Sequence, residues 1–134
     1  EADPSGEEMG LICFNSTASL AADRAYQRTI PAGDDFFPSP SDFVYTLPNI
    51  VTGEIAIRHH IQGETAFYVL RAFNPETICH IVRETIADAD LHRAFVGWID
   101  IDTDRLDARA VLCVDRPHGN SPELTPEALL QLFP

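Results

Sequence analysis

Lysine is absent from this chain, and basic residues as a whole are scarce. Nine arginines stand against 21 acidic residues, so the formal net charge is −12 over 134 residues. Such a surface repels nucleic acids, because proteins bind a phosphate backbone mainly by neutralising it with lysine and arginine. We therefore do not expect nucleic acid as a partner. The same charge disfavours docking onto other acidic surfaces.

Long apolar runs are also missing, and cysteine is rare. No stretch of about 18 apolar residues occurs, so we expect no membrane-spanning helix. The first ten residues, EADPSGEEMG, are too polar and acidic for a signal peptide. Cys13, Cys79 and Cys113 are an odd number of cysteines in apolar surroundings, which favours buried free thiols in a reducing cytoplasm. A disulfide between Cys13 and Cys113 is the alternative.

The overall composition, with 45% hydrophobic residues, is typical of a globular protein. A length of 134 residues suits one domain with one core. We expect a single domain over residues 1–134. Residues 1–9 form a polar N-terminal segment, and residues 117–134 form a tail that ends in a short helix.

Apolar periodicity, capping residues and turn residues predict the order of elements. The predicted strands cover 10–14, 66–73, 94–101 and 108–114, and the predicted helices cover 18–29, 47–60, 74–87 and 125–133. Residues 31–42 contain three prolines and are expected to form a loop. The last two strands should form an antiparallel hairpin with its turn at 102–107. Helix 47–60 should be largely buried, because isoleucine and valine cover much of its circumference. This order indicates a layered α/β domain with a mixed sheet.

Residues 43–73, FVYTLPNIVTGEIAIRHHIQGETAFYVLRAF, resemble the segment of β-ketoacyl synthases that leads to their catalytic cysteine. Asn49 and Gly53 match the family's helix, and Gly63 matches its tight turn. GLICFNSTAS at 10–19 is similar to the family's early strand and loop. ADADLHRAFVGWIDI at 87–101 is similar to the turn and strand that follow the nucleophile. The resemblance covers roughly 10–117 and implies a thiolase-like half-domain, a truncated variant of the N-terminal half of a condensing enzyme.

The family's nucleophile is a cysteine at the N-terminus of a buried helix, where the helix dipole favours the thiolate. The corresponding positions here are Ala72, Phe73 and Asn74, and none of them is a nucleophile. Cys79 lies about one turn further on, and its neighbour His80 points about 100° away around a helix. We interpret Cys79 as a buried apolar residue and keep it as a remote candidate nucleophile. The family's decarboxylating residues lie in its second half, which the resemblance does not cover.

Other polar clusters fall short of a metal or cofactor site. His59 and His60 are adjacent and so lie on different helix faces, which prevents a two-histidine metal pair. Asp100, Asp102 and Asp104 resemble the start of a calcium loop. Arg105 and Val111 stand where that loop needs glycine and glutamate, so a solvated hairpin turn explains the acids better.

A phosphate loop is also not expected at Ser16, Thr17 and Ser19, because its glycines and lysine are missing. We therefore expect neither a metal nor a cofactor. Trp98 takes the place of a small residue in the family pattern and is interpreted as a core residue that closes space an acyl chain would use.

The resemblance implies a non-catalytic, ketosynthase-like protein: a scaffold or partner subunit in fatty-acid or polyketide-type biosynthesis. One alternative is an active β-ketoacyl-ACP synthase subunit or fragment that acts through a cysteine elsewhere in the chain. Another alternative is a module that binds an acyl chain or another small molecule. Carrier proteins, which are typically acidic, should be repelled by this surface.

The resemblance also implies how the chain associates. In β-ketoacyl synthases the strand before the nucleophile pairs with its copy across a twofold axis. The matching strand here is apolar on both faces, which is typical of a strand buried on both. We therefore expect a homodimer, or a heterodimer with a ketosynthase, and a cytoplasmic location. The expected interface residues are Phe67, Tyr68, Val69, Leu70 and Phe73.

Overall fold

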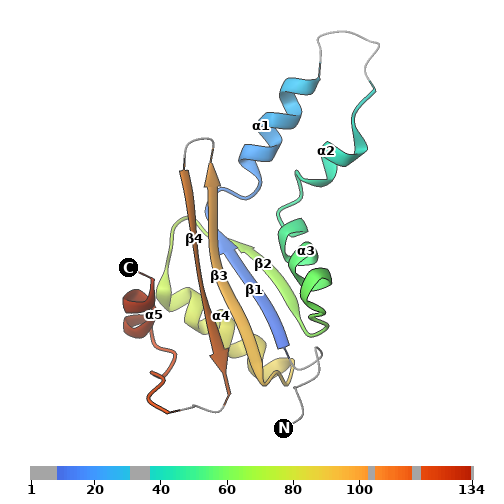
Figure 1. Cartoon of the computed structure of the whole chain (residues 1–134). Helices are drawn as coiled ribbons and strands as arrows, with labels where there is room; N and C mark the ends of the chain where they lie inside the picture. The colour runs from blue at the N-terminus through green and yellow to red at the C-terminus, as the bar shows by residue number, and fades with distance from the viewer. Residues whose placement is uncertain (1–8, 31–36, 103–104, 116–118, 134) are drawn as a thin grey trace.

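The computed structural model describes residues 9–30, 37–102, 105–115 and 119–133, and it has the expected layered α/β architecture (Figure 1). The elements in chain order are β1 (Met9–Asn15), α1 (Leu20–Thr29), α2 (Pro40–Val44), α3 (Ile50–His59), β2 (Thr65–Val69), α4 (Pro75–Asp88), β3 (Arg93–Asp102), β4 (Arg105–Val114) and α5 (Pro126–Leu132). Within the described ranges, none of the helices combines the length and the apolar composition needed to cross a bilayer.

The four strands form one mixed sheet, as the sequence predicts, and their order in it is β2-β1-β3-β4. β1 pairs in parallel with both β2 and β3, and β3 and β4 form the predicted antiparallel hairpin. β1 is one of the two inner strands and carries a continuous apolar run from Leu11 to Phe14 that is fully buried. Such a run is typical of a parallel strand that is covered on both faces.

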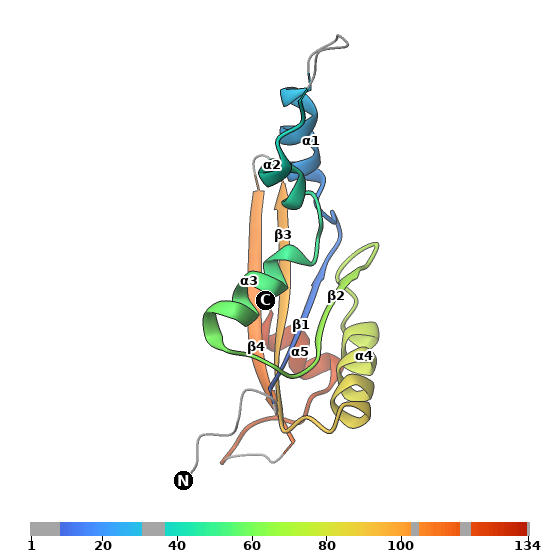
Figure 2. The same ribbon diagram turned by 90° about the vertical axis from the view of Figure 1, so that its right-hand side faces the viewer.

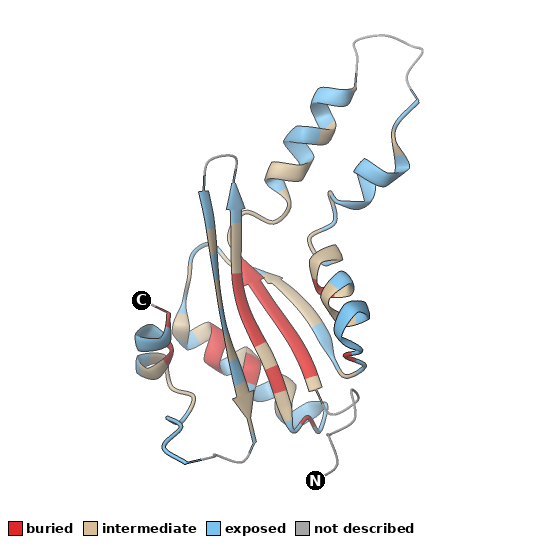
Figure 3. Ribbon diagram, in the orientation of Figure 1, coloured by how far each residue is buried: buried red, intermediate tan, exposed pale blue. Residues whose placement is uncertain are grey.

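Two groups of apolar side chains cover the two faces of the sheet, with α4 on one side and α3 on the other (Figure 2). The larger group joins Ile12 and Phe14 of β1 to α4, α5 and the inner side of β3. The smaller group joins Leu11 and Cys13 to α3 and to Ile61. The most deeply buried residues therefore lie in β1, β3 and the inner side of α4 (Figure 3).

Prolines at the first position mark three of the helix starts. Asn74 precedes Pro75, and its side chain accepts a hydrogen bond from the backbone N–H of Thr77 at 2.9 Å. Thr125 caps α5 in the same way at Ala128, at 3.2 Å. These two helix starts match the sequence prediction, because a capping side chain followed by proline leaves few backbone donors unpaired.

The third proline-marked helix, α2, corrects the prediction of a loop over 31–42. Ser39 caps it, Pro40 stands in its first turn, and Asp42 supplies an acidic residue near its N-terminus. The local signal was therefore present in the sequence. α1 and α2 lie beyond one end of the sheet (Figure 1). The rings of Tyr26 and Phe43 pack edge to face between them, with centroids 5.9 Å apart.

Two further predictions need correction. α3 is not largely buried: Thr52 is its one buried residue, and the side chain of Ile57 is 79% exposed. α3 contacts one face of β1 and β2 and leaves its other side open. β2 ends at Val69 and not at Phe73, because the chain leaves the sheet edge after Val69 to reach α4. By contrast, β3 and β4 run further toward their turn than predicted.

Candidate functional site

β2 is an edge strand of the sheet. Along β2, the backbone N–H and carbonyl groups of successive residues point alternately toward β1 and toward the open edge. The N–H of Leu11 donates to the carbonyl of Glu64 at 2.9 Å, and the N–H of Leu70 donates to the carbonyl of Asn15 at 2.8 Å. Hydrogen-bonding direction alternates along a parallel strand, so the backbone groups of Thr65, Phe67 and Val69 point away from β1. The outer edge of β2 therefore offers three N–H groups and three carbonyls for pairing with another strand.

The side chains of the expected interface do not share one environment. Tyr68 stacks on Phe14 inside the larger core group, with ring centroids 5.4 Å apart. Phe67 packs on the opposite face against the smaller core group. Val69 is 52% exposed. The two faces of β2 are thus partly covered within the chain, and Val69 is the residue that remains most open to a neighbour.

Leu70 and Phe73, which were expected in the same strand, lie in the connection to α4 and pack against the larger core group. The ring of Phe73 meets Trp98 edge to face at 5.3 Å and lies 5.7 Å from the ring of Phe133. Trp98 is buried, in agreement with its interpretation as a core residue. Aromatic rings therefore fill the space beside the N-terminus of α4.

The start of α4 lies where the resembled family carries its nucleophile. Ala72 has no functional group, and Phe73 contributes a ring to the core. The side chain of Asn74 accepts the N–H of Thr77 and so serves as a helix cap. Among the positions predicted from the resemblance, none combines a nucleophilic atom with exposure.

Cys79, the remote candidate, lies in the second turn of α4 and is only 2% exposed. Burial raises the pKa of its thiol, although the charge of Arg83 acts in the opposite direction. A raised pKa keeps the sulfur protonated, whereas a nucleophile needs the thiolate. His80, its neighbour in sequence, is exposed and lies about 100° further around the helix.

All three cysteines are free. Burial raises the pKa of Cys13 to about 11, and burial together with the nearby Cys79 raises the pKa of Cys113 to about 11. Cys13 belongs to the α3 face of the sheet, and Cys113 packs against the α4 face. The alternative of a Cys13–Cys113 disulfide is therefore wrong, because the sheet separates the two sulfurs.

The loop after β1 binds a negatively charged group of the same chain, the carboxylate of Asp100. The carboxylate of Asp100 accepts hydrogen bonds from the backbone N–H groups of Ser16 and Thr17 at 2.9 and 3.2 Å, and from their hydroxyls at 2.6 and 3.0 Å. Burial alone would raise the pKa of Asp100, but the hydrogen bonds from Ser16 and Thr17 outweigh it and lower that pKa. Sequence reasoning missed this cluster, because it joins residues more than 80 positions apart.

The remaining polar candidates stay apart in space. His59 and His60 end α3, and His92 contacts Asp115 at 2.9 Å. Asp102 forms an ion pair with Arg24 at 3.1 Å. Asp104 and His118 lie outside the described residues. Among the residues that the structure does describe, no three metal-ligating side chains come together.

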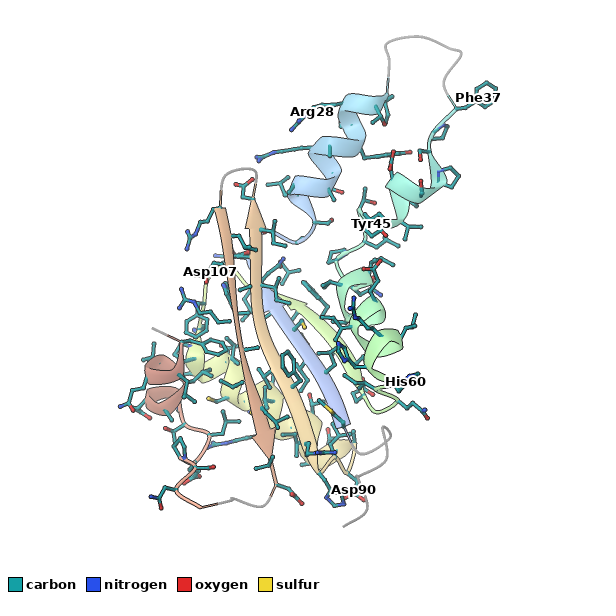
Figure 4. The ribbon with its side chains drawn as sticks, in the orientation of Figure 1. Arg28, Phe37, Tyr45, His60, Asp90 and Asp107 are labelled. Carbon is teal, nitrogen blue, oxygen red and sulfur yellow. The ribbon has the colours of Figure 1, made fainter. Side chains whose placement is uncertain are left out.

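A cavity of about 310 Å³ lies between the α3 face of the sheet, α1, and the connection that carries Tyr45. Figure 4 labels Tyr45 on this connection between α2 and α3. Most of its lining is apolar, and it includes Ala22, Val51, Phe67 and Ile99. The cavity lies beyond the carboxyl end of β1, at the place where the chain connections diverge to opposite faces of the sheet. Open α/β sheets commonly bind ligands at this position.

Comparison with known proteins supports the fold class. No family profile matches the chain, and no curated protein matches it. A solved structure that it resembles is the ketosynthase ApeO in complex with its chain length factor ApeC from Xenorhabdus doucetiae. The two share 10% sequence identity and superpose with a TM-score of 0.55 over 73% of this chain and 40% of that chain. The domain therefore has a ketosynthase-like, thiolase-like fold, and it spans less than half the length of that neighbour.

Proposed function

We propose that this chain is a non-catalytic partner subunit that pairs through the edge of β2 with a second thiolase-like chain. The observation that carries the proposal is the free edge at Thr65, Phe67 and Val69, directly before a helix start without a nucleophile. Strand addition at such an edge supplies affinity through main-chain hydrogen bonds. The pathway we propose is fatty-acid or polyketide-type biosynthesis, because the similar fold belongs to a ketosynthase.

The region at the start of α4 supports a structural role over a catalytic one. Phe73, Trp98 and Phe133 occupy the space that a substrate would need beside the helix N-terminus. Asn74 uses its side chain as a cap. Catalysis by a condensing enzyme needs an exposed thiolate and room for an acyl group, and this region offers neither.

A ketosynthase fits better than a second copy as the partner. Two copies of this chain would bring two charges of −12 together, which disfavours association of like with like. Direct docking of an acidic carrier protein is disfavoured for the same reason. We therefore place the biosynthetic role at the β2 edge and expect any contact with the carrier to be made by the partner.

The test replaces Val69 with proline. Proline removes one N–H and is tolerated at the outer edge of a sheet, and the N–H of Val69 points away from β1. Val69→Pro should therefore leave the chain folded but weaken its co-purification with a co-expressed ketosynthase at least tenfold.

Tyr68→Pro is the matched control, since the N–H of Tyr68 points toward β1. That variant should lose thermal stability, because it removes a hydrogen bond inside the sheet. If Val69→Pro stays folded and still binds the ketosynthase with unchanged affinity, the β2 edge is not the interface.

A further inference from the structure

The cavity between α1, α3 and the sheet has a lining whose chemistry defines what it could bind. Fourteen residues line it, and most of them are aliphatic or aromatic. Small side chains, at Ala18 in the loop before α1 and at Ala21 and Ala22 on α1, leave the space open. A volume of about 310 Å³ holds about ten non-hydrogen atoms, at roughly 30 Å³ for each water-sized group. The cavity therefore suits an aliphatic chain of about eight carbons.

Two of the four polar side chains in the lining are already occupied by the protein. The amide of Asn15 donates to the carbonyl of Ala18 at 2.7 Å and accepts the N–H of Ala18 at 3.0 Å. The hydroxyl of Ser19 donates to the carbonyl of Thr46. These groups hold the loop after β1 in place, and a ligand would gain little from them.

The other two polar side chains form a pair that a ligand can use. Tyr45 and Glu54 both line the cavity, and interaction with the Glu54 carboxylate raises the pKa of Tyr45. Both residues are exposed to solvent, so the carboxylate keeps free lone pairs. A carboxylate accepts hydrogen bonds and attracts cations, and it repels other anions.

No arginine or histidine is found in the lining, as far as the described residues go, and the whole chain contains no lysine. A fatty carboxylate or a phosphate head would therefore meet Glu54 without any compensating cation. The net charge of −12 acts in the same direction. An ammonium head, by contrast, could donate hydrogen bonds directly to the Glu54 carboxylate.

We propose that this cavity binds an aliphatic amine, with the hydrocarbon chain among the alanines of α1, Val51 and Ile99, and the ammonium group on the Glu54–Tyr45 pair. The site lies on the α3 face of the sheet, away from the start of α4. It does not depend on strand pairing by β2.

The test compares three ligands of equal chain length by calorimetric titration of the full chain: octylamine, octanol and octanoate. Octylamine should bind most tightly, octanol should bind about tenfold more weakly, and octanoate should bind most weakly. A hydrogen bond to a charged group is worth more than a neutral one by enough to account for such a factor. Equal binding of all three, tighter binding of octanoate, or no binding of octylamine at millimolar concentration would each overturn the proposal.

Two variants locate the site. Glu54→Gln keeps the shape of the side chain and removes its charge, so octylamine should lose its advantage over octanol. Ala22→Leu adds bulk on α1, where leucine is a good helix former, and should weaken octylamine and octanol alike. Glu84→Gln, on the exposed side of α4, is the matched control and should change nothing. Octylamine binding that is unchanged in both Glu54→Gln and Ala22→Leu would place the amine elsewhere and refute the assignment.

Discussion

At the scale of single residues, Asp100 connects the loop after β1 to the neighbouring strand β3. Its carboxylate receives four hydrogen bonds from Ser16 and Thr17. Asp100→Asn replaces one acceptor oxygen with a donor that faces the Ser16 hydroxyl. We expect a loss of about 1–2 kcal/mol in the free energy of unfolding at pH 7, because charge-assisted hydrogen bonds are lost. Urea denaturation measures this loss, with Glu84→Gln as the control.

The effect of Asp100→Asn should also depend on pH. The folded-state pKa of Asp100 lies below its unfolded value. Its stabilising contribution is therefore fully present above the unfolded pKa, near 4, and is lost as the pH falls through the folded pKa. The difference in unfolding free energy between wild type and variant should shrink as the pH is lowered from 6 to 2. A constant difference across that range would mean that the charge of Asp100 is not what stabilises the loop.

The cysteines give a second prediction at this scale. We expect no stable adduct when the folded chain is incubated with an acyl-thioester, because Cys79 is 2% exposed and burial raises its pKa. Cys13 and Cys113, with pKa values of about 11, carry a thiolate in about one molecule in a thousand at pH 8. Intact-mass spectrometry provides the measurement. A specific adduct that disappears in Cys79→Ser would restore the active-synthase alternative.

At the scale of elements, the start of α4 depends on its cap. Asn74→Ala removes the acceptor for the N–H of Thr77 and should cost about 1 kcal/mol of unfolding free energy. Asn74→Asp is the matched comparison and should cost only a few tenths, since aspartate keeps an acceptor oxygen and is equally favoured at this position. Thermal unfolding of both variants tests the difference. Equal losses would show that the hydrogen bond of the Asn74 side chain does not stabilise the helix.

Elements with a local signal were the ones that the sequence could predict. α4 and α5 begin at a capping residue followed by proline, and the β3–β4 hairpin has two apolar strands around an acidic turn. α2 carries the same local signal at Ser39 and Pro40, yet the three prolines of that region favoured a loop. The capping signal for α2 was therefore present in the sequence, but the prolines around it outweighed it in the prediction.

Features that depend on neighbours could not be predicted in the same way. The apolar sequence of α3 suggested burial on all sides, but only one side of the helix meets the sheet, and Ile57 remains exposed. β2 stops at Val69 because the chain must turn toward α4. The contact between Asp100 and Ser16 joins positions far apart in sequence. None of these outcomes has a signature within a window of ten or so residues.

At the scale of the whole molecule, the sheet has two different edges. β4 ends one side in a ten-residue hairpin strand, and the five-residue β2 ends the other. Leu106 and Leu112 of β4 are exposed, at 71% and 54%. They point to the same side of the sheet as α3, since their partners in β3 are Ile101 and Phe95. Exposed apolar side chains are thus found on the β4 side of the sheet as well as on helices such as α3, where Ile57 is exposed.

The position of β1 has a consequence for how the chain emerges from a ribosome. β1 comes first in the sequence but lies between β2 and β3, whose residues follow some 50 and 80 positions later. During synthesis β1 must therefore wait, with both of its edges unpaired, until β2 and β3 have been made. Such long-range pairing slows folding and exposes surfaces that aggregate. We therefore expect the nascent β1 segment to be bound by chaperones that hold apolar segments until they can pair.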